Sequence, residues 1–225
     1  MITGDGIFEG MTLKLIRSEL FHAQVALFVA IALQVTVWGI NGQLLVGPQY
    51  VLIPIEIVLA LVIGFTSRAK QNSTFNHFFS LGLLGLISVV NVSSLVLVSH
   101  SLIIGHHSIA GPELLGSAVA IFITNIIVYA LWYWEIDSPA FTKAKLTKNE
   151  RDFQFTQQHM KHEFGTWRAQ FFDYLYVSIT NAINFAPADT KPLSHAAKLL
   201  MGSQALISVF TLALVVARSV SILGA

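Results

Sequence analysis

Long apolar runs separated by short polar segments dominate this chain of 225 residues. Each run reaches or nearly reaches the roughly 20 residues that an α-helix needs to cross the hydrocarbon core of a bilayer. The second run is the shortest, and Pro54 near its start suits the first turn of a helix. The pattern predicts five transmembrane helices, at about residues 21–40, 50–65, 78–104, 114–134 and 196–222.

Two segments outside these runs have a mixed pattern. Residues 7–20 carry apolar side chains at helical spacing among charged ones, which predicts a short amphipathic helix at the membrane surface. Residues 137–170 are polar, and we expect a connector there, with Phe153 and Phe155 in a helix at the lipid headgroups. The chain then divides into an N-terminal segment (1–20), a four-helix bundle (21–136), a connector (137–170) and a C-terminal unit (171–225).

The segment from Asp173 to Leu193, DYLYVSITNAINFAPADTKPL, follows neither pattern. It predicts a short amphipathic helix over 171–186, a turn through Asp189, and then the last apolar helix. Irregular backbone at membrane depth is tolerated only where protein or water satisfies its polar groups. We therefore predict a re-entrant half-helix. The fold class is all-α integral membrane, with five transmembrane helices plus this half-helix before the last one.

The residues of this segment also carry a resemblance. Tyr176 and Ser178 lie where the pore helix of potassium channels carries Tyr and Ser, and Asp189 lies where an Asp follows their filter. The triplet 192–194, Pro-Leu-Ser, is similar to the Pro-x-Thr that opens their inner helix. The segment resembles the pore region of potassium channels, which implies an ion-conducting homo-oligomer, by analogy a tetramer.

The filter of those channels is not matched. Residues 183–188 replace Thr-Val-Gly-Tyr-Gly and contain no glycine. Glycine permits the positive φ that turns successive carbonyls toward a pore, whereas Pro187 fixes φ and removes an amide donor. Side chains, chiefly Asn184 and Asp189, are then expected to select monovalent ions. The candidate selectivity residues are Ser178, Asn181, Asn184, Phe185, Ala186, Pro187 and Asp189.

Five polar residues inside the apolar runs are further candidates. A carboxylate in a bilayer is costly, so Glu56 marks a functional site or is protonated or paired, with Asn91 or Asn125 as possible partners. The two asparagines are also typical of hydrogen bonds between membrane helices. Gln204 and Ser208 are one helical turn apart, and their shared face lines a vestibule or packs on the half-helix. Small residues that would let helices approach closely are Gly82, Gly85, Gly116 and Ser117.

Composition narrows the class of protein. Apolar residues make up 54% of the chain, charged residues 11%, and mean hydropathy is +0.67, which is far from soluble averages. A net charge of +1 argues against nucleic acid as a partner, and cysteine is absent. The histidines show no zinc-site spacing and no haem-ligating pair. We expect no cofactor, no metal and no enzymatic activity, which disfavours a membrane-embedded enzyme or redox subunit.

Basic residues predict the orientation. Lys14 and Arg17 precede the first run, and Arg68 and Lys70 follow the second, whereas the alternate loops contain none. Positive charge stays on the cytoplasmic side, so the N-terminus and the connector are expected there. The half-helix would then enter from inside, although the loop of potassium channels enters from outside. Arg218 weakly favours the opposite orientation.

Two functions remain open at this level. The first is an oligomeric ion channel with a non-standard selectivity loop. The second is a non-conducting structural or accessory subunit of a larger membrane complex, because no catalytic constellation is present and several helix faces carry glycine. The whole chain also resembles a poorly characterised group of bacterial multi-pass membrane proteins, which implies the bacterial inner membrane.

Overall fold

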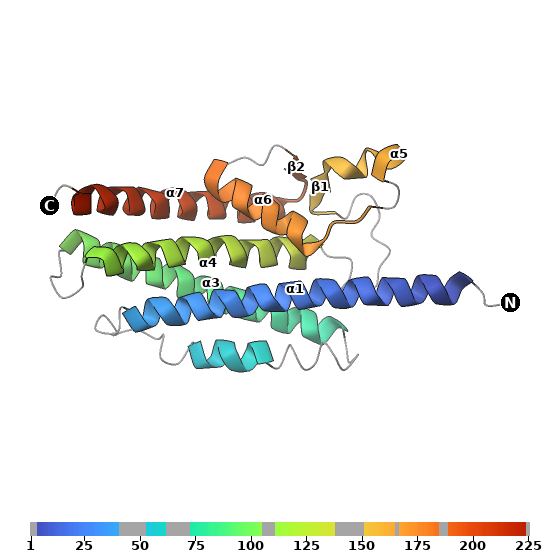
Figure 1. The fold of residues 1–225 in the computed structure, drawn as a ribbon, viewed down its shortest axis with the longest axis horizontal. Coiled ribbons are helices and arrows are strands. Elements are labelled where there is room, and N and C mark those ends of the chain that lie inside the picture. The colour runs from blue at the N-terminus through green and yellow to red at the C-terminus, as the bar shows by residue number, and fades with distance from the viewer. Residues whose placement is uncertain are drawn as a thin grey trace.

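The computed structural model describes residues 4–40, 53–61, 73–104, 111–137, 151–164, 167–184 and 189–223. Nearly all of them are helical (Figure 1). Residues 53–61 form one helical segment. The other elements are α1 (Gly4–Ile40), α3 (Ser73–Ile104), α4 (Gly111–Asp137), β1 (Phe153–Phe155), the 3₁₀ helix η2 (Thr156–Gln158), α5 (Lys161–Phe164), α6 (Phe171–Asn184), β2 (Thr190–Pro192) and α7 (His195–Leu223).

Four of these helices are long and apolar enough to cross a membrane. Their apolar spans are Phe21–Gly39, Phe79–Ser101, Pro112–Asp137 and His195–Val220. The chain is therefore a helical membrane protein. Only 53–61 of the second predicted span is described, as helix, and the rest of that span lies outside the described residues.

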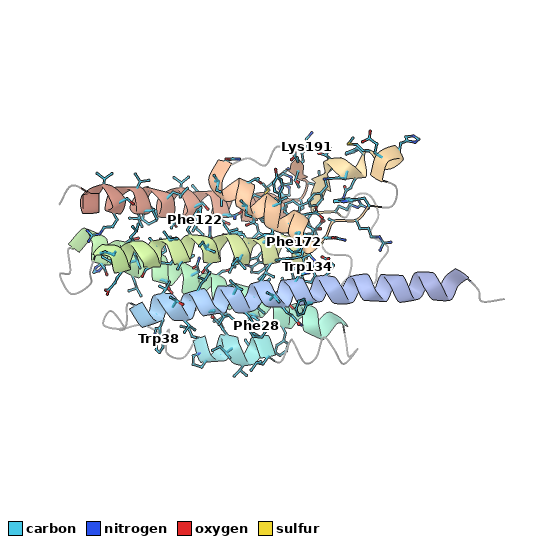
Figure 2. All side chains as sticks on the ribbon, in the orientation of Figure 1. Phe28, Trp38, Phe122, Trp134, Phe172 and Lys191 are labelled. Atoms are coloured by element: carbon cyan, nitrogen blue, oxygen red, sulfur yellow. The ribbon has the colours of Figure 1, made fainter. Side chains whose placement is uncertain are left out.

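The central element of the bundle is α4. It packs against α1, α3, α6 and α7, and 67% of its apolar span is buried inside the protein, compared with 22% for α7. Residues from α4, α1 and α6 meet in the main apolar core. Figure 2 shows Trp134 and Phe172 at the end of the bundle where α6 begins, and Trp38 toward the other end of α1.

The N-terminal segment does not form a separate helix. A single helix of 37 residues, α1, runs through the predicted boundary at residue 20. No proline stands between residues 4 and 40, so nothing in the sequence interrupts the hydrogen-bond ladder. The polar and apolar parts of α1 are therefore one continuous element, and its N-terminal part projects beyond the bundle (Figure 1).

The connector contains a short strand instead of a helix at the headgroups. Phe153 and Phe155 are 0% and 3% exposed, which contradicts the predicted position at the membrane surface. The two strands pair antiparallel, with Gln154 opposite Lys191. The alternation Phe-Gln-Phe has the period of a strand, so both rings point to one buried face. This two-stranded ribbon, β1–β2, joins the connector to the start of α7.

Candidate functional site

The short helix predicted over 171–186 is present as α6 from Phe171 to Asn184, and residues 185–186 lie outside the described residues. Its 14 residues are about 21 Å long. Its first residue, Phe171, lies beside Trp134 near the end of α4, with ring centroids 6.3 Å apart. After α6 the chain reaches β2, which pairs with β1 at that same end of the bundle. The chain thus leaves and re-joins one end of the bundle (Figure 1).

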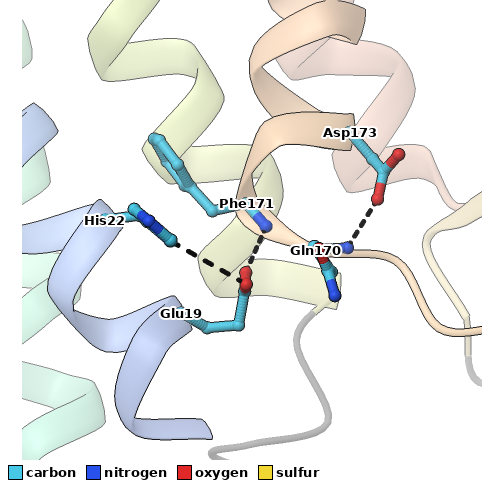
Figure 3. A network of polar contacts seen from close by, with 5 residues as sticks. All are labelled: Glu19, His22, Gln170, Phe171 and Asp173. Atoms are coloured by element: carbon cyan, nitrogen blue, oxygen red, sulfur yellow. Dashed lines mark hydrogen bonds and ion pairs between the residues drawn. The ribbon is translucent and has the colours of Figure 1, made fainter. Parts of the chain in front are cut away.

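Two carboxylates hold the N-terminus of α6 (Figure 3). The backbone N–H of Gln170 donates to Asp173 Oδ2 over 2.7 Å, as the reciprocal half of a capping box does. The N–H of Phe171 donates to Glu19 of α1, and His22 Nδ1 lies 4.0 Å from the other oxygen of Glu19. Partial burial raises the pKa of Asp173, and the hydrogen bond from Gln170 opposes that rise. Negative charge at this end complements the helix dipole.

Replacing Glu19 with alanine should weaken the attachment of α6 to α1. Glu19→Ala removes both the acceptor for Phe171 and the charge, and we expect a loss of about 1 kcal/mol in the free energy of unfolding. Glu19→Gln keeps an acceptor oxygen and should lose less. Thermal unfolding of the purified protein measures both, and equal stability of E19A and wild type would contradict the contact.

A buried polar cluster joins α6 to α4 and α7. We call it the Gln204 network: it consists of Tyr133, Ser178, Asn181 and Gln204, each at most 2% exposed. Gln204 Nε2 donates to the carbonyl oxygen and the hydroxyl of Ser178, over 3.0 and 2.7 Å. Gln204 Oε1 accepts from the hydroxyl of Tyr133 and, over 2.8 Å, from Asn181 Nδ2. The side-chain amide of Gln204 therefore makes four hydrogen bonds, all of them to residues of the same chain.

Two more hydrogen bonds join the Gln204 network to backbone carbonyls of α4 and α7. The hydroxyl of Ser178 donates to the carbonyl of Ile126 in α4 over 2.6 Å. Asn181 Nδ2 also donates to the carbonyl of Met201 in α7 over 3.0 Å. Buried polar groups are stable only when they are hydrogen-bonded, and here each meets a partner. The network therefore fixes the depth and rotation of α6 against its neighbours.

The predicted lining residues separate into two groups. Gln204 and Ser208 share a face, as expected, but that face packs inside the chain, and Ser208 accepts from Asn125 Nδ2 over 3.1 Å. Ser178 and Asn181 are buried as well. The exposed residues of the predicted set are Asn184 and Asp189. Phe185, Ala186 and Pro187 lie outside the described residues.

A second anchor lies at the end of α4, and the sequence did not reveal it. Asp137 is 7% exposed and accepts from the hydroxyl of Tyr174 over 2.7 Å. It also accepts from the backbone N–H of Asp152 over 2.8 Å and of Phe153 over 3.3 Å. One carboxylate thus connects α4, α6 and the ribbon. The only signal in the sequence is an acidic residue closing an apolar helix.

The start of α7 is tied to the same region. The hydroxyl of Ser194 caps the helix by accepting from the N–H of Ala197 over 3.1 Å, and it donates to the carboxylate of Asp152. The N–H of Leu193 donates to the carbonyl of Asp152 over 2.8 Å. The Pro-Leu-Ser triplet predicted to open the last helix therefore spans the end of β2 and the helix cap.

Glu56 does not pair with the asparagines proposed for it. Its side chain is 0% exposed, and neither carboxyl oxygen has a hydrogen-bond partner among the described residues. Asn125 donates to Ser208, and Asn91 donates to the carbonyl of Ile121 over 3.5 Å. Both asparagines do connect neighbouring helices, as the sequence predicted.

Two other expectations differ from the structure. Among the described residues no other helix closely approaches Gly82, Gly85 or Gly116, because a Cβ at each would meet nothing within 4 Å. The aromatic residues that close the fourth apolar run are of the kind that predicts a belt at the lipid headgroups. Tyr133 and Trp134 are instead 0% and 6% exposed, since α6 and the ribbon cover them.

The histidines near the connector do not gather metal ligands. His159 contacts the side-chain amide of Gln154. Within the part of the chain that the structure describes, no three His, Asp or Glu residues are grouped so that they could hold a metal ion.

Comparison with known proteins leaves the family open. No protein-family model, no curated protein and no solved structure matches this chain.

Proposed function

We propose that this chain forms an oligomeric ion channel of the bacterial inner membrane, with α6 and the following turn as a re-entrant pore element. One observation carries the proposal: a 14-residue helix begins at one end of the bundle, and the chain returns to that end through β2. A helix of about 21 Å is too short to cross a hydrocarbon core of about 30 Å. Backbone that turns at such a depth is tolerated where it lines water or packs in protein.

The electrostatics of α6 favour a cation at its inner end. Glu19 and Asp173 satisfy the N-terminus at the end of the bundle. The C-terminal carbonyls carry partial negative charge, and Asn184 at that end is exposed. Asp189 is exposed on the returning chain. We assign ion selection to Asn184, to Asp189 and to the residues between them.

The Gln204 network has a supporting role in this proposal. Its side chains are hydrogen-bonded within one chain, so they hold the pore element and do not line the conduit. A single half-helix cannot enclose a conduit, so several copies around an axis are required. The outward face of α6 is apolar and suits contact with a neighbouring copy; it consists of Phe172, Tyr176, Ile179 and Ile183.

Orientation follows from the exposed bases at the end where α6 begins. Arg151, Arg168 and Lys191 are exposed there. Positive charge favours the cytoplasmic side, so we propose that the N-terminus and the entry of α6 are cytoplasmic.

Ion flux tests the proposal. Proteoliposomes containing the purified full chain should take up monovalent cations, and Asp189→Asn should lower the preference for cations over anions severalfold by removing an exposed charge. Glu163→Gln is the matched control, because it removes another exposed carboxylate from the same end of the protein. Silent proteoliposomes across a range of voltage and pH, or a strictly monomeric particle in native lipid, would reject conduction.

A second candidate is a non-conducting structural subunit. The observation that favours it is the complete internal pairing of Ser178, Asn181 and Gln204, which are the polar groups that a lumen would otherwise use. Under this alternative α6 is a buttress between α4 and α7. Absence of flux together with co-purification of a stable partner from native membrane would select it.

A further inference from the structure

The exposed face of α7 carries an open groove. Leu199 and Leu206 flank it, each 75% exposed, and Gly202 lies between them about one helical turn from either. A Cβ on Gly202 would meet nothing within 4 Å, so the missing side chain creates the notch. The groove continues to Val209 and has a volume of about 630 Å³. The hydroxyl of Ser203 is already engaged by Tyr129 and by the Leu200 carbonyl, which leaves an apolar lining.

The length and ends of the groove match one leaflet of a bilayer. Lys198 lies at its mouth, in the first turn of α7, and Val209 lies at its inner limit. These residues are eleven apart, which is about 17 Å along a helix. Half of a hydrocarbon core is about 15 Å. An acyl chain that enters beside Lys198 therefore ends near the midplane.

Basic and acidic side chains at this end of the bundle differ in their exposure. The carboxylates of Glu19, Asp137, Asp152 and Asp173 accept hydrogen bonds from within the protein. The exposed bases are Arg151, Arg168, Lys191 and Lys198, whereas the exposed carboxylates among the described residues here are Glu163 and Asp189. Figure 2 places Lys191 on the outer side of β2. Among the exposed side chains at this end, bases outnumber carboxylates by four to two, and an exposed base attracts an anionic headgroup.

We infer that this groove binds one acyl chain of an anionic phospholipid whose phosphate contacts Lys198. The acyl chain packs against the apolar wall and into the notch at Gly202, and Lys198 at the mouth of the groove complements the charge of the phosphate. A neighbouring helix that filled the same notch would have to bring its own acidic residue to Lys198, whereas an anionic phospholipid supplies both the apolar chain and the charge. The inference concerns lipid on the outer face of α7 and does not depend on conduction through α6.

Native mass spectrometry of the full chain tests the inference. The protein is released from detergent that contains either phosphatidylglycerol or phosphatidylcholine, and the two lipids have identical acyl chains. Wild type should retain one phosphatidylglycerol about fivefold more than phosphatidylcholine, the effect expected of one lysine near a charged headgroup. Lys198→Gln should abolish this preference. Lys191→Gln removes a nearby exposed charge outside the groove and should keep it. Equal retention of the two lipids by wild type, or an unchanged preference in K198Q, would overturn the site.

Filling the notch tests the apolar part separately. Gly202→Leu should remove retention of either lipid, and it replaces glycine in a helix with a better helix former, so folding is not at risk. Gly116→Leu on α4 is the matched control, since a Cβ there also meets nothing within 4 Å. Lipid retention by G202L equal to that of G116L would refute the groove. So would conversion of an oligomer to a monomer by G202L with lipid retention intact, because a second copy would then occupy it.

Discussion

Gln204→Leu should release α6 from the bundle. Gln204 joins Tyr133, Ser178 and Asn181 through four hydrogen bonds, and leucine leaves all of these partners buried without it. Hydrogen bonds between membrane helices average about 0.6 kcal/mol, and unsatisfied buried groups cost about 1–3 kcal/mol each. We expect a loss of about 3 kcal/mol in the free energy of unfolding. The melting temperature should fall by roughly 6–12 °C.

The absence of cysteine from the chain permits a direct readout of this release. A cysteine at Ala182, which is 0% exposed, should resist maleimide in the wild-type background and react in Q204L. A cysteine at Asn184, which is exposed at the end of α6 that is proposed to meet water, should react in both backgrounds and controls for access of the reagent. Leu206→Ala on the same helix, at an exposed position, should leave the Ala182 site protected. Protection of that site in Q204L would contradict the role of the network.

Asp137→Ala should open the ribbon and loosen α6 together. The substitution removes the acceptor for Tyr174 and for the N–H groups of Asp152 and Phe153. We expect a loss of about 3 kcal/mol in the free energy of unfolding, because three donors at a largely buried site lose their partner. Asp137→Asn keeps one acceptor oxygen and should lose less.

A disulfide across the ribbon reports whether it has opened. Gln154 lies opposite Lys191, and residues paired in this way have Cα atoms about 4.5–5.5 Å apart, within the range of a disulfide. The pair Q154C and K191C should cross-link readily in the wild-type background and slowly in D137A. Glu163→Ala, at an exposed position, is the control. Equal cross-linking rates in D137A and E163A would show that Asp137 does not hold the ribbon closed.

The sequence predicted the features that depend on long windows or local geometry. Apolar runs of about 20 residues identify the four long helices, because length and hydropathy decide whether a helix can cross a bilayer. The amphipathic pattern at helical spacing predicts α6. Helical periodicity places Gln204 and Ser208 on the same face of α7.

The remaining features depend on partners far apart in the chain. An aromatic residue closing an apolar helix is typical of a headgroup belt, so Tyr133 was not connected with Gln204, 71 residues away. Three-residue strands are too short for periodicity to identify, and β1 and β2 are separated by the whole of α6. The sequence placed polar residues on α6 and α7 but could not distinguish a lumen from a satisfied interior, because that choice depends on which helices meet.

The position of the ribbon imposes an order on biosynthesis. β1 emerges from the ribosome well before its partner β2, and Gln204 emerges later still, so α6 has no complete set of contacts until much of α7 has been made. During that interval Ser178 and Asn181 lack their hydrogen-bond partner Gln204, and water or the insertion machinery must take its place. A chain that stalls before residue 204 therefore carries α6 without its contacts to Gln204.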